Sequence, residues 1–157
     1  MTAASDSPAV RRARAGDADE IARLYAQLVA NPALRVLSER LRELETAADA
    51  AVFVVERDGG LLGTVLVALC ADVMFGRRPF AVVENVVVDA PARGQGVGHA
   101  LLRAVDRFCL AADCSKIMLL SATERVEAHR FFERSGYTGD RKRGFVKYRN
   151  AFAAASA

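Results

Sequence analysis

The spacing of apolar residues predicts helices near the start of the chain, after one short strand from Val10 to Arg14. Four residues recur at the i, i+3, i+4 and i+7 positions of one helical face: Ile21, Leu24, Tyr25 and Leu28. Asp17 precedes them as an N-cap, and Pro32 ends the helix because it lacks a backbone N–H. A second helix is expected from Ser38, as its N-cap, to about Ala47.

From residue 51 the apolar pattern changes to that of strands. Two apolar runs, Ala51 to Glu56 and Leu61 to Leu69, flank Asp58-Gly59-Gly60. This sequence indicates a hairpin, because glycine adopts positive φ without steric cost. A further strand is expected from Phe80 to Val88.

The second half of the chain alternates helix and strand. One helical face is formed by Val97, Leu101, Val105, Phe108 and Ala112. A buried strand follows from Lys116 to Ser121, and then a helix with Thr123 as its cap and Gly136 at its end. Phe145 to Tyr148 is expected as the last strand. This order predicts an α/β fold with a mixed, mainly antiparallel sheet flanked by helices.

Composition adds that the chain is a single domain. We expect one domain over its 157 residues, with a core at about 8–150 and flexible ends at 1–7 and 151–157. The net charge of +3 is too small to indicate nucleic-acid binding. No stretch approaches the ~20 uncharged apolar residues of a membrane span. Residues 1–9 lack the basic start and apolar core of an export signal, so a cytoplasmic location without a membrane partner is expected.

The cysteines and histidines do not indicate a metal site. Cys70, Cys109 and Cys114 are odd in number and lack C-x-x-C spacing, which favours free thiols over disulfides or zinc. Neither His99 nor His129 has a second ligand at metal-binding spacing. We therefore expect no metal.

The most informative stretch lies between the strand that ends at Val88 and the helix that runs from His99. It reads Arg93, Gly94, Gln95, Gly96, Val97 and Gly98. Its alternate glycines leave room for a phosphate near the backbone N–H groups, and a helix start adds unpaired donors and the positive end of the dipole. The pattern predicts a site for a nucleotide-like cofactor. The alternative is a glycine-rich turn that serves only as a helix entry.

Two well-known phosphate loops do not fit this stretch. A dinucleotide fold needs an acidic residue about twenty positions further on, but that region, Ile117 to Leu120, is an apolar strand. A nucleotide triphosphate loop needs Gly-Lys followed by Ser or Thr, and here His99 and Ala100 follow Gly98.

The stretch does resemble the Arg/Gln-x-x-Gly-x-Gly/Ala signature of the GNAT superfamily of acyl-CoA-dependent N-acetyltransferases. Arg93, Gly96 and Gly98 occupy its fixed positions. The likeness covers roughly residues 8 to 150. It also rests on the stretches Val10 to Asp19, Glu84 to Asp89 with Pro91, and Glu127 to Tyr137.

The resemblance implies a sheet that splays between its fourth and fifth strands, with the cofactor acetyl-CoA in the gap. Carried over, the fourth-strand stretch Val86, Val87 and Val88 receives the pantetheine arm, through backbone groups of Val86 and Val88. Arg93 and Gly94 begin the loop, and the N–H groups of Gln95, Gly96, Val97 and Gly98 receive the pyrophosphate. The open backbone edge serves the cofactor while alternate side chains serve the core.

The implied reaction is attack of a primary amine on the acetyl thioester, and it needs a base because most amines are protonated at pH 7. Glu84 interrupts an apolar strand and is the candidate base or water relay. The alternative is that Glu84 pairs with an arginine such as Arg78 or faces solvent. Asn85 is expected to polarise the thioester carbonyl through its backbone N–H.

The chain departs from the family at two positions. The tyrosine that in many relatives protonates the departing thiolate is replaced by Phe132. The asparagine that touches pantetheine is replaced by Arg125, which is a candidate cofactor contact. Tyr137 is interpreted as a packing residue.

The leading hypothesis is therefore acetyl transfer to a primary amine of a small molecule, such as an amine, an amino acid or an amino sugar. Direct attack in a ternary complex is implied. The alternatives are a protein lysine or N-terminal acetyltransferase, and a catalytically weakened acyl-CoA-binding module. A homodimer is expected through the last strand, because Phe145 is expected near an exposed edge.

Overall fold

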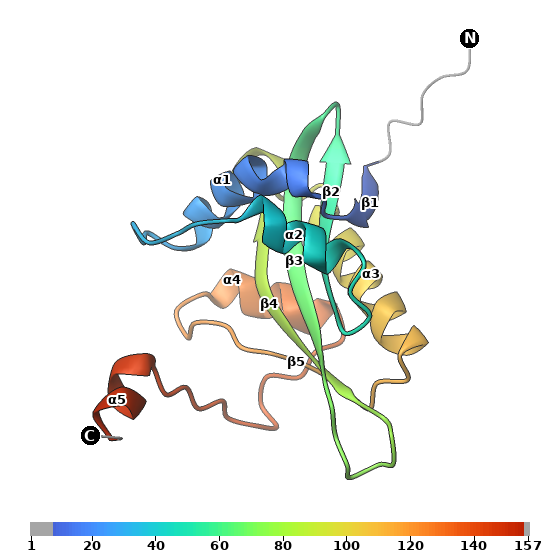
Figure 1. Cartoon of the computed structure of the whole chain (residues 1–157), viewed down its shortest axis with the longest axis vertical. Coiled ribbons are helices and arrows are strands. Elements are labelled where there is room, and N and C mark those ends of the chain that lie inside the picture. Colours follow the sequence, from blue (N-terminus) through green and yellow to red (C-terminus); the bar gives the residue numbers. More distant parts are fainter. Residues whose placement is uncertain (1–7, 156–157) are drawn as a thin grey trace. The chain divides into compact units, whose positions relative to one another are not determined.

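A computed structural model describes residues 8–155. These residues form two compact units, one that ends at Leu119 and one that begins at Leu120. The first unit is built, in chain order, from β1 (Ala9–Arg12), the 3-10 turn η1 (Ala15–Asp17), α1 (Ala18–Leu28), α2 (Ser38–Glu45), β2 (Ala50–Arg57), β3 (Gly60–Cys70), β4 (Phe80–Val88), the 3-10 turn η2 (Ala90–Ala92), α3 (Val97–Ala111) and β5 (Ile117–Leu119) (Figure 1).

The five strands form one sheet in the order β1-β2-β3-β4-β5. All neighbours are antiparallel except β4 and β5, whose parallel pairing joins Ala81–Val83 to Ile117–Leu119. This confirms the expected mixed, mainly antiparallel sheet. From Glu84 onward, β4 has no described strand partner on the β5 side. The two strands therefore separate where the resemblance implied a splay.

The hairpin between β2 and β3 forms as predicted. Asp58 and Gly59 have φ values of 52° and 77°. Positive φ at both central residues is the type I′ geometry, whose twist matches that of the flanking strands. The turn thereby brings the end of β2 and the start of β3 to one end of the sheet.

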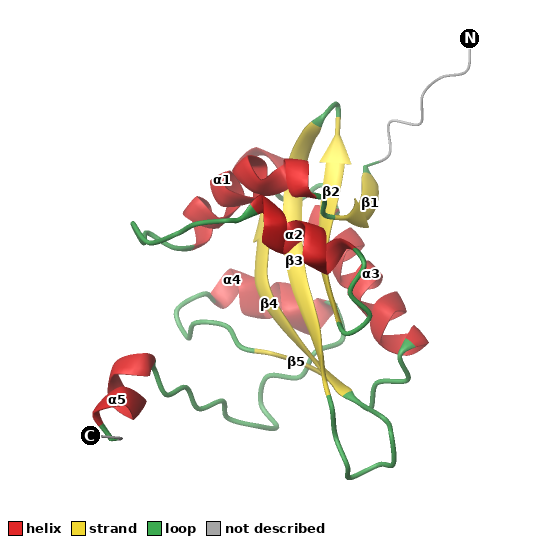
Figure 2. Cartoon of the chain, in the orientation of Figure 1, coloured by secondary structure: helices red, strands yellow, loops and turns green. Residues whose placement is uncertain are grey.

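Helices cover both faces of the sheet, α3 on one and α1 with α2 on the other (Figure 2). The core under α3 includes Val83 of β4 with Val97, Leu101 and Val105 of the helix. The core under α1 and α2 includes Ile21, Leu24 and Leu41, with Val87 of the same strand β4. Residues of β4 thus enter both cores.

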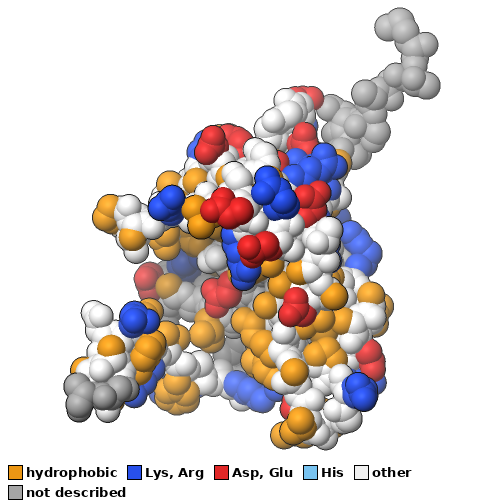
Figure 3. All heavy atoms as spheres, viewed as in Figure 1, with side chains coloured by type: hydrophobic (Ala, Val, Ile, Leu, Met, Phe, Trp, Pro, Cys, Tyr) orange, Lys and Arg blue, Asp and Glu red, His pale blue; other side chains and the backbone are white. Residues whose placement is uncertain are grey.

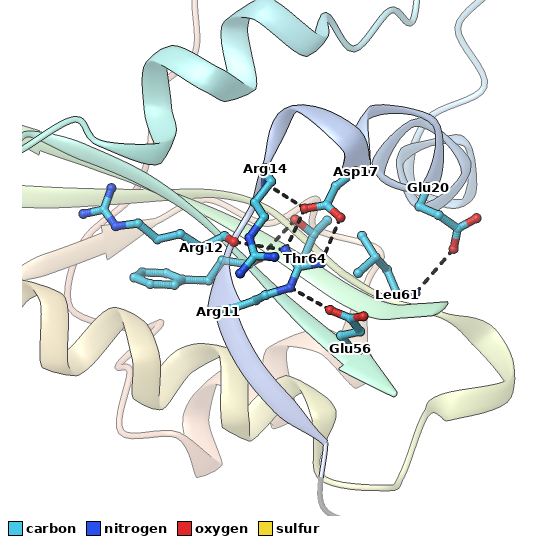
Figure 4. A network of polar contacts seen from close by, with 9 residues as sticks. Arg11, Arg12, Arg14, Asp17, Glu20, Glu56, Leu61 and Thr64 are labelled. Atoms are coloured by element: carbon cyan, nitrogen blue, oxygen red, sulfur yellow. Dashed lines mark hydrogen bonds and ion pairs between the residues drawn. The ribbon is translucent and has the colours of Figure 1, made fainter. Parts of the chain in front are cut away.

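A polar network joins β1 to the start of α1 (Figure 4). Arg11 donates from Nη1 to Asp17 Oδ2 at 2.7 Å and from Nε to Glu56 Oε2 at 2.6 Å. The backbone N–H of Arg14 also donates to Asp17 Oδ2. Asp17 precedes α1 as expected, but its carboxylate binds these groups and makes no cap bond to the helix.

Two other expected caps are wrong. Leu37, rather than Ser38, stands at the N-cap of α2, and Arg125 rather than Thr123 stands at that of α4 (Val126–Arg134). Neither of these helices has a side-chain cap bond at its start. A cap preference alone therefore misplaced the two N-caps, by one residue and by two residues.

The second unit holds α4 and the short helix α5 (Arg149–Ala154). Helix α4 ends as predicted at Gly136, which has a φ of 92°. Its N–H donates to Glu133 O at 3.0 Å, and the N–H of Tyr137 donates to Phe132 O at 3.1 Å. These two bonds form a Schellman motif, which satisfies the last carbonyls of the helix.

The expected last strand, Phe145 to Tyr148, is wrong. These residues are in irregular structure, and Tyr148 is the N-cap of α5. A strand needs a partner for its backbone groups, and no described strand pairs with this segment. The alanine-rich run after it favours helix instead, so residues 151–154, expected as a flexible tail, lie in α5. The expected flexible residues 1–7 and 156–157 lie outside the described part of the chain.

Two surface properties bear on partners. No helix among residues 8–155 is long and apolar enough to cross a bilayer. On the face shown in Figure 3, acidic and basic side chains are interspersed over α1 and α2. That part of the surface therefore presents no patch of a single charge.

Candidate functional site

The site begins with an irregularity in β4. In its pairing with β3, Thr64 lies opposite Val87 and Leu66 opposite Glu84, so β4 has one residue more than β3 in this interval. Asn85 lies inside it with a φ of 55°. This is a β-bulge, and asparagine is one of the few residues that adopts such a conformation readily.

The bulge changes which side chains of β4 face α3. Before it, Ala81 and Val83 belong to the core under α3. After it, Val86 and Val88 pack against that core, while Val87 belongs to the core on the opposite face. The side chains that face α3 are therefore odd-numbered before Asn85 and even-numbered after it.

The backbone of β4 beyond the bulge has one edge without a strand partner. The N–H of Asp89 donates to Leu62 O at 2.8 Å, which directs the peptide groups of Asp89 and Val87 toward β3. Those of Val86 and Val88 therefore point to the other edge. There, Val88 O accepts a long hydrogen bond of 3.4 Å from Nε of Arg93. Of the three expected pantetheine residues, Val86 and Val88 present their backbone at this edge, and Val87 does not.

Glu84 stands immediately before the bulge and is exposed. The suggested pairing with Arg78 is not formed, because Arg78 forms an ion pair with Asp113 at 3.1 Å. No ion pair joins Glu84 to another described residue. Its carboxylate thus lies at the surface, next to the point where β4 and β5 separate.

Tyr25 of α1 contacts the bulge from the face of the sheet opposite α3. Burial raises the pKa of its phenol, and the side chain of Asn85 opposes this shift by hydrogen bonding to it. The contact joins α1 to the one β4 residue with positive φ. Sequence reasoning placed Tyr25 only on the apolar face of its helix and missed this contact.

The loop between β4 and α3 contains two glycines with positive φ and leads directly into the helix. Gly94 and Gly96 have φ values of 76° and 81°, and Gly96 is the N-cap of α3. The first helical bond runs from Ala100 N to Gly96 O at 3.0 Å. The amides of Val97 and Gly98 precede this bond, so they have no acceptor within the helix.

Helix α1 fixes the start of this loop. Gln27 donates from Nε2 to Asp89 Oδ1 at 2.7 Å and accepts from the N–H of Ala90 at 3.1 Å. Arg23 forms an ion pair of 3.1 Å with Asp89. The bond from Gln27, together with Arg23, holds the pKa of Asp89 below its usual value. These contacts join residues far apart in the sequence, so no local pattern could have revealed them.

The loop has a second anchor at the end of β2. Arg57 donates from Nη1 to Gln95 Oε1 at 3.1 Å, and Gln95 Nε2 donates to Pro91 O at 3.1 Å. Sequence reasoning gave Gln95 only a backbone role and did not consider Arg57.

In the second unit, the positions that depart from the family pattern lie in and beside α4. Phe132 is buried, and its ring lies 6.0 Å from that of Tyr137 in an edge-on arrangement. This contact agrees with a packing role for Tyr137. Arg125 is exposed at the N-cap of α4, and its expected cofactor contact stays a prediction.

The chain is similar to known acetyltransferases. Residues 18–137 match the model of the Acetyltransferase (GNAT) family. An aminoglycoside N(6')-acetyltransferase type 1 of Stenotrophomonas maltophilia is 31% identical over 138 residues, which cover 85% of this chain and 88% of that protein.

Two solved structures share the fold. A putative acetyltransferase from Agrobacterium tumefaciens has 27% identity and a TM-score of 0.78, covering 90% of this chain and 99% of its own. The structure of AAC(6')-Iy in complex with a bisubstrate analogue, CoA-S-monomethyl-acetylneamine, has 20% identity and a TM-score of 0.74, covering 91% and 99%. At that identity, the second likeness concerns the fold alone. Together with the open edge of β4 and the glycine loop before α3, the family match shows that this chain belongs to the GNAT acetyltransferases, enzymes that use acetyl-CoA.

Proposed function

We propose that this protein transfers the acetyl group of acetyl-CoA to a primary amine of a small molecule, by direct attack in a ternary complex. The observation that carries the proposal is the bulge at Asn85, which is followed by an open backbone edge and a glycine loop at a helix start. These three features are consecutive in the chain and suit consecutive parts of one extended molecule.

The glycine loop suits the pyrophosphate. The amides of Val97 and Gly98 lack acceptors within α3, and the helix dipole places partial positive charge at this end. At Gly94 and Gly96, a Cβ atom would meet no neighbour within 4 Å, so the backbone there is open to a ligand. An anion can thus approach the N–H groups of Gln95 to Gly98 directly.

The open edge suits the pantetheine arm. Its amide groups need donors and acceptors, and Val86 and Val88 direct theirs away from β3. An arm that pairs with them extends the sheet as an added strand. Because the recognition uses backbone groups, the valine side chains remain available for the core under α3.

Glu84 and Asn85 lie where such an arm would end. When bound, the donor supplies an activated acetyl thioester at this point. Glu84, exposed and outside any ion pair with a described residue, accepts the proton of the incoming ammonium, directly or through water. The bulge turns the peptide of Asn85 out of the regular β3 pairing, and its N–H polarises the thioester carbonyl.

An amino sugar is the acceptor class that we favour among small amines. Support comes from the relative at 31% identity, which is named as an acetyltransferase of aminoglycosides. A panel of amino sugars, simple amines, amino acids and lysine peptides, scored by release of the CoA thiol, tests this choice. Release with peptides alone would favour a protein acetyltransferase. Binding of acetyl-CoA without release for any acceptor would indicate an acyl-CoA-binding module.

The cofactor placement is tested by two substitutions at one position. Gly96→Ala and Gly96→Asp both strain a backbone with a φ of 81°, but only aspartate adds negative charge. We expect Gly96→Asp to weaken acetyl-CoA binding at least about tenfold more than Gly96→Ala, measured by isothermal titration calorimetry. Equal affinity of the two folded variants would refute the placement.

A further inference from the structure

Arg57, the last residue of β2, clamps the phosphate loop, which we define as residues 93–98. Its Nη1 donates to Gln95 Oε1 at 3.1 Å, and Gln95 Nε2 donates to Pro91 O at 3.1 Å. Both ends of the Gln95 amide are therefore engaged. The exposed side chain of Gln95 is held between the end of β2 and the turn η2.

The position of Gln95 gives this clamp its importance. Gly94 and Gly96 lie on either side of it with φ values of 76° and 81°. Glycines leave a free loop many conformations, and a loop that is ordered only on binding loses that entropy at the expense of affinity. A fixed side chain between the two glycines restricts the peptide groups on both sides. The clamp thus preorganises the amides proposed to receive the pyrophosphate.

Arg57 itself is not explained by the packing of the fold. It is half-buried, and no described carboxylate forms an ion pair with it. Its Nε is buried without a hydrogen-bond partner among the described residues. An unsatisfied buried donor destabilises a fold, so fold stability does not account for an arginine at this position. The contact of its side chain with the loop does.

We propose that Arg57 is a positioning residue for acetyl-CoA, which acts through Gln95 to hold the phosphate loop in its binding conformation. The inference rests on the proposed placement of the cofactor at this loop. It goes further in naming a residue outside the family signature, on a different strand, that sets cofactor affinity without touching the reacting atoms.

A double-mutant cycle with isothermal titration calorimetry tests the proposal, with acetyl-CoA as the titrated probe. Arg57→Met and Gln95→Ala should each raise the Kd by about five- to tenfold. The double variant should be no weaker than the weaker single variant, because the second change removes a contact already broken. Since saturation with acetyl-CoA restores the bound loop, kcat should stay within about twofold while the KM for acetyl-CoA rises.

Two further variants serve as controls. Arg57→Lys keeps a donor for Gln95 and should recover most of the affinity. Arg107→Met removes one charge from an exposed position on α3 and should leave the Kd unchanged. A loss in Arg107→Met equal to that in Arg57→Met would mean that net charge, and not the clamp, sets affinity.

Two other outcomes overturn the proposal. Multiplicative losses in the double variant would show that Arg57 acts on the phosphates independently of Gln95. An unchanged Kd in Gln95→Ala would show that the clamp has no effect, and this exposed loop residue gives the answer even where Arg57→Met does not fold. Comparison of Gly96→Ala with Gly96→Asp distinguishes a failure of the clamp proposal from a wrong placement of the cofactor. Those two variants should differ in acetyl-CoA affinity whenever the cofactor binds at the loop, whether or not Arg57 contributes.

Discussion

Gly63 of β3 lies so close to Val97, the first residue of α3, that a Cβ atom built on it would be 2.9 Å from Val97 Cγ1. The same atom would lie 2.8 Å from the carbonyl oxygen of Val87. The absence of a side chain at this position lets the start of α3 rest directly on the sheet. The phosphate loop immediately before Val97 is positioned by this contact.

Gly63→Ala should therefore destabilise the fold, by about 1–3 kcal/mol, because neither a backbone carbonyl nor a buried valine can move away freely. Gly60→Ala is the matched control on the same strand, since its Cβ would meet only Arg57 O at 3.8 Å. Urea unfolding of the two variants measures the difference. Equal unfolding free energies would show that α3 adjusts without strain.

Glu84→Gln should lower kcat at neutral pH by about a hundredfold and leave the Kd for acetyl-CoA nearly unchanged, because it removes a proton acceptor and keeps the shape. The pH profile of kcat, recorded for both proteins, is the decisive measurement. Glu39→Gln, at an exposed position on α2, controls for the loss of one carboxylate. Matching profiles for wild type and Glu84→Gln would leave Glu84 without a catalytic role.

Tyr137→Phe should keep kcat within a few-fold of wild type, because the ring packs edge-on against Phe132 and phenylalanine preserves that contact. Steady-state kinetics at saturating acetyl-CoA checks this. A loss of about a hundredfold or more would identify Tyr137 as the acid that replaces the missing tyrosine at position 132.

Asp17→Asn should destabilise the fold at neutral pH by about 1–3 kcal/mol, through the loss of charge-assisted bonds to Arg11. The bond from Arg11 lowers the pKa of Asp17 in the folded state. The stabilisation is therefore present above the unfolded pKa, about 3.9, and is lost as the pH falls through the lower folded pKa. Denaturation curves between pH 7 and pH 2 should show the gap to wild type closing at the acid end. Asp106→Asn, at an exposed position within α3, controls for the loss of one carboxylate.

The homodimer was expected to form through a last strand, and that argument fails because Phe145 to Tyr148 is not a strand. The residues Phe145 and Tyr148 are nevertheless 89% and 77% exposed, which favours self-association through this segment. We expect a dimer by light scattering at tens of micromolar, and a monomer for the double variant Phe145→Ser, Tyr148→Ser. A wild-type mass near 16.9 kDa would contradict this.

The elements of the sheet and the glycine loop could be predicted because each has a local cause. The Asp58-Gly59 turn and the apolar faces of α1 and α3 are set by neighbouring residues. The bulge was missed because Ala81, Val83 and Val87, the most buried residues of β4, are all an even number of residues apart, as they would be in a regular strand, although Val87 faces the other way. Asn85 within a β-branched run was the one signal available. The contacts of Arg57 and Gln27 with the loop depend on the folded arrangement of distant strands and helices, and no spacing rule could have supplied them.

The bulge at Asn85 also constrains how the gene for this protein can change. At its present length, a β4 without the bulge would place Val87 toward α3, and Val86 and Val88 toward α1. Deleting the codon for Asn85 removes the extra residue, so the shortened strand would be regular and Val86 and Val88 would still face α3. The pairing with β3 would be kept on both sides of the deletion, so the open edge would also keep its direction. The deletion would remove the peptide that leaves the β3 pairing and the contact of Asn85 with Tyr25, while both cores would persist. The extra residue is thus needed for the proposed chemistry of the strand and not for its packing.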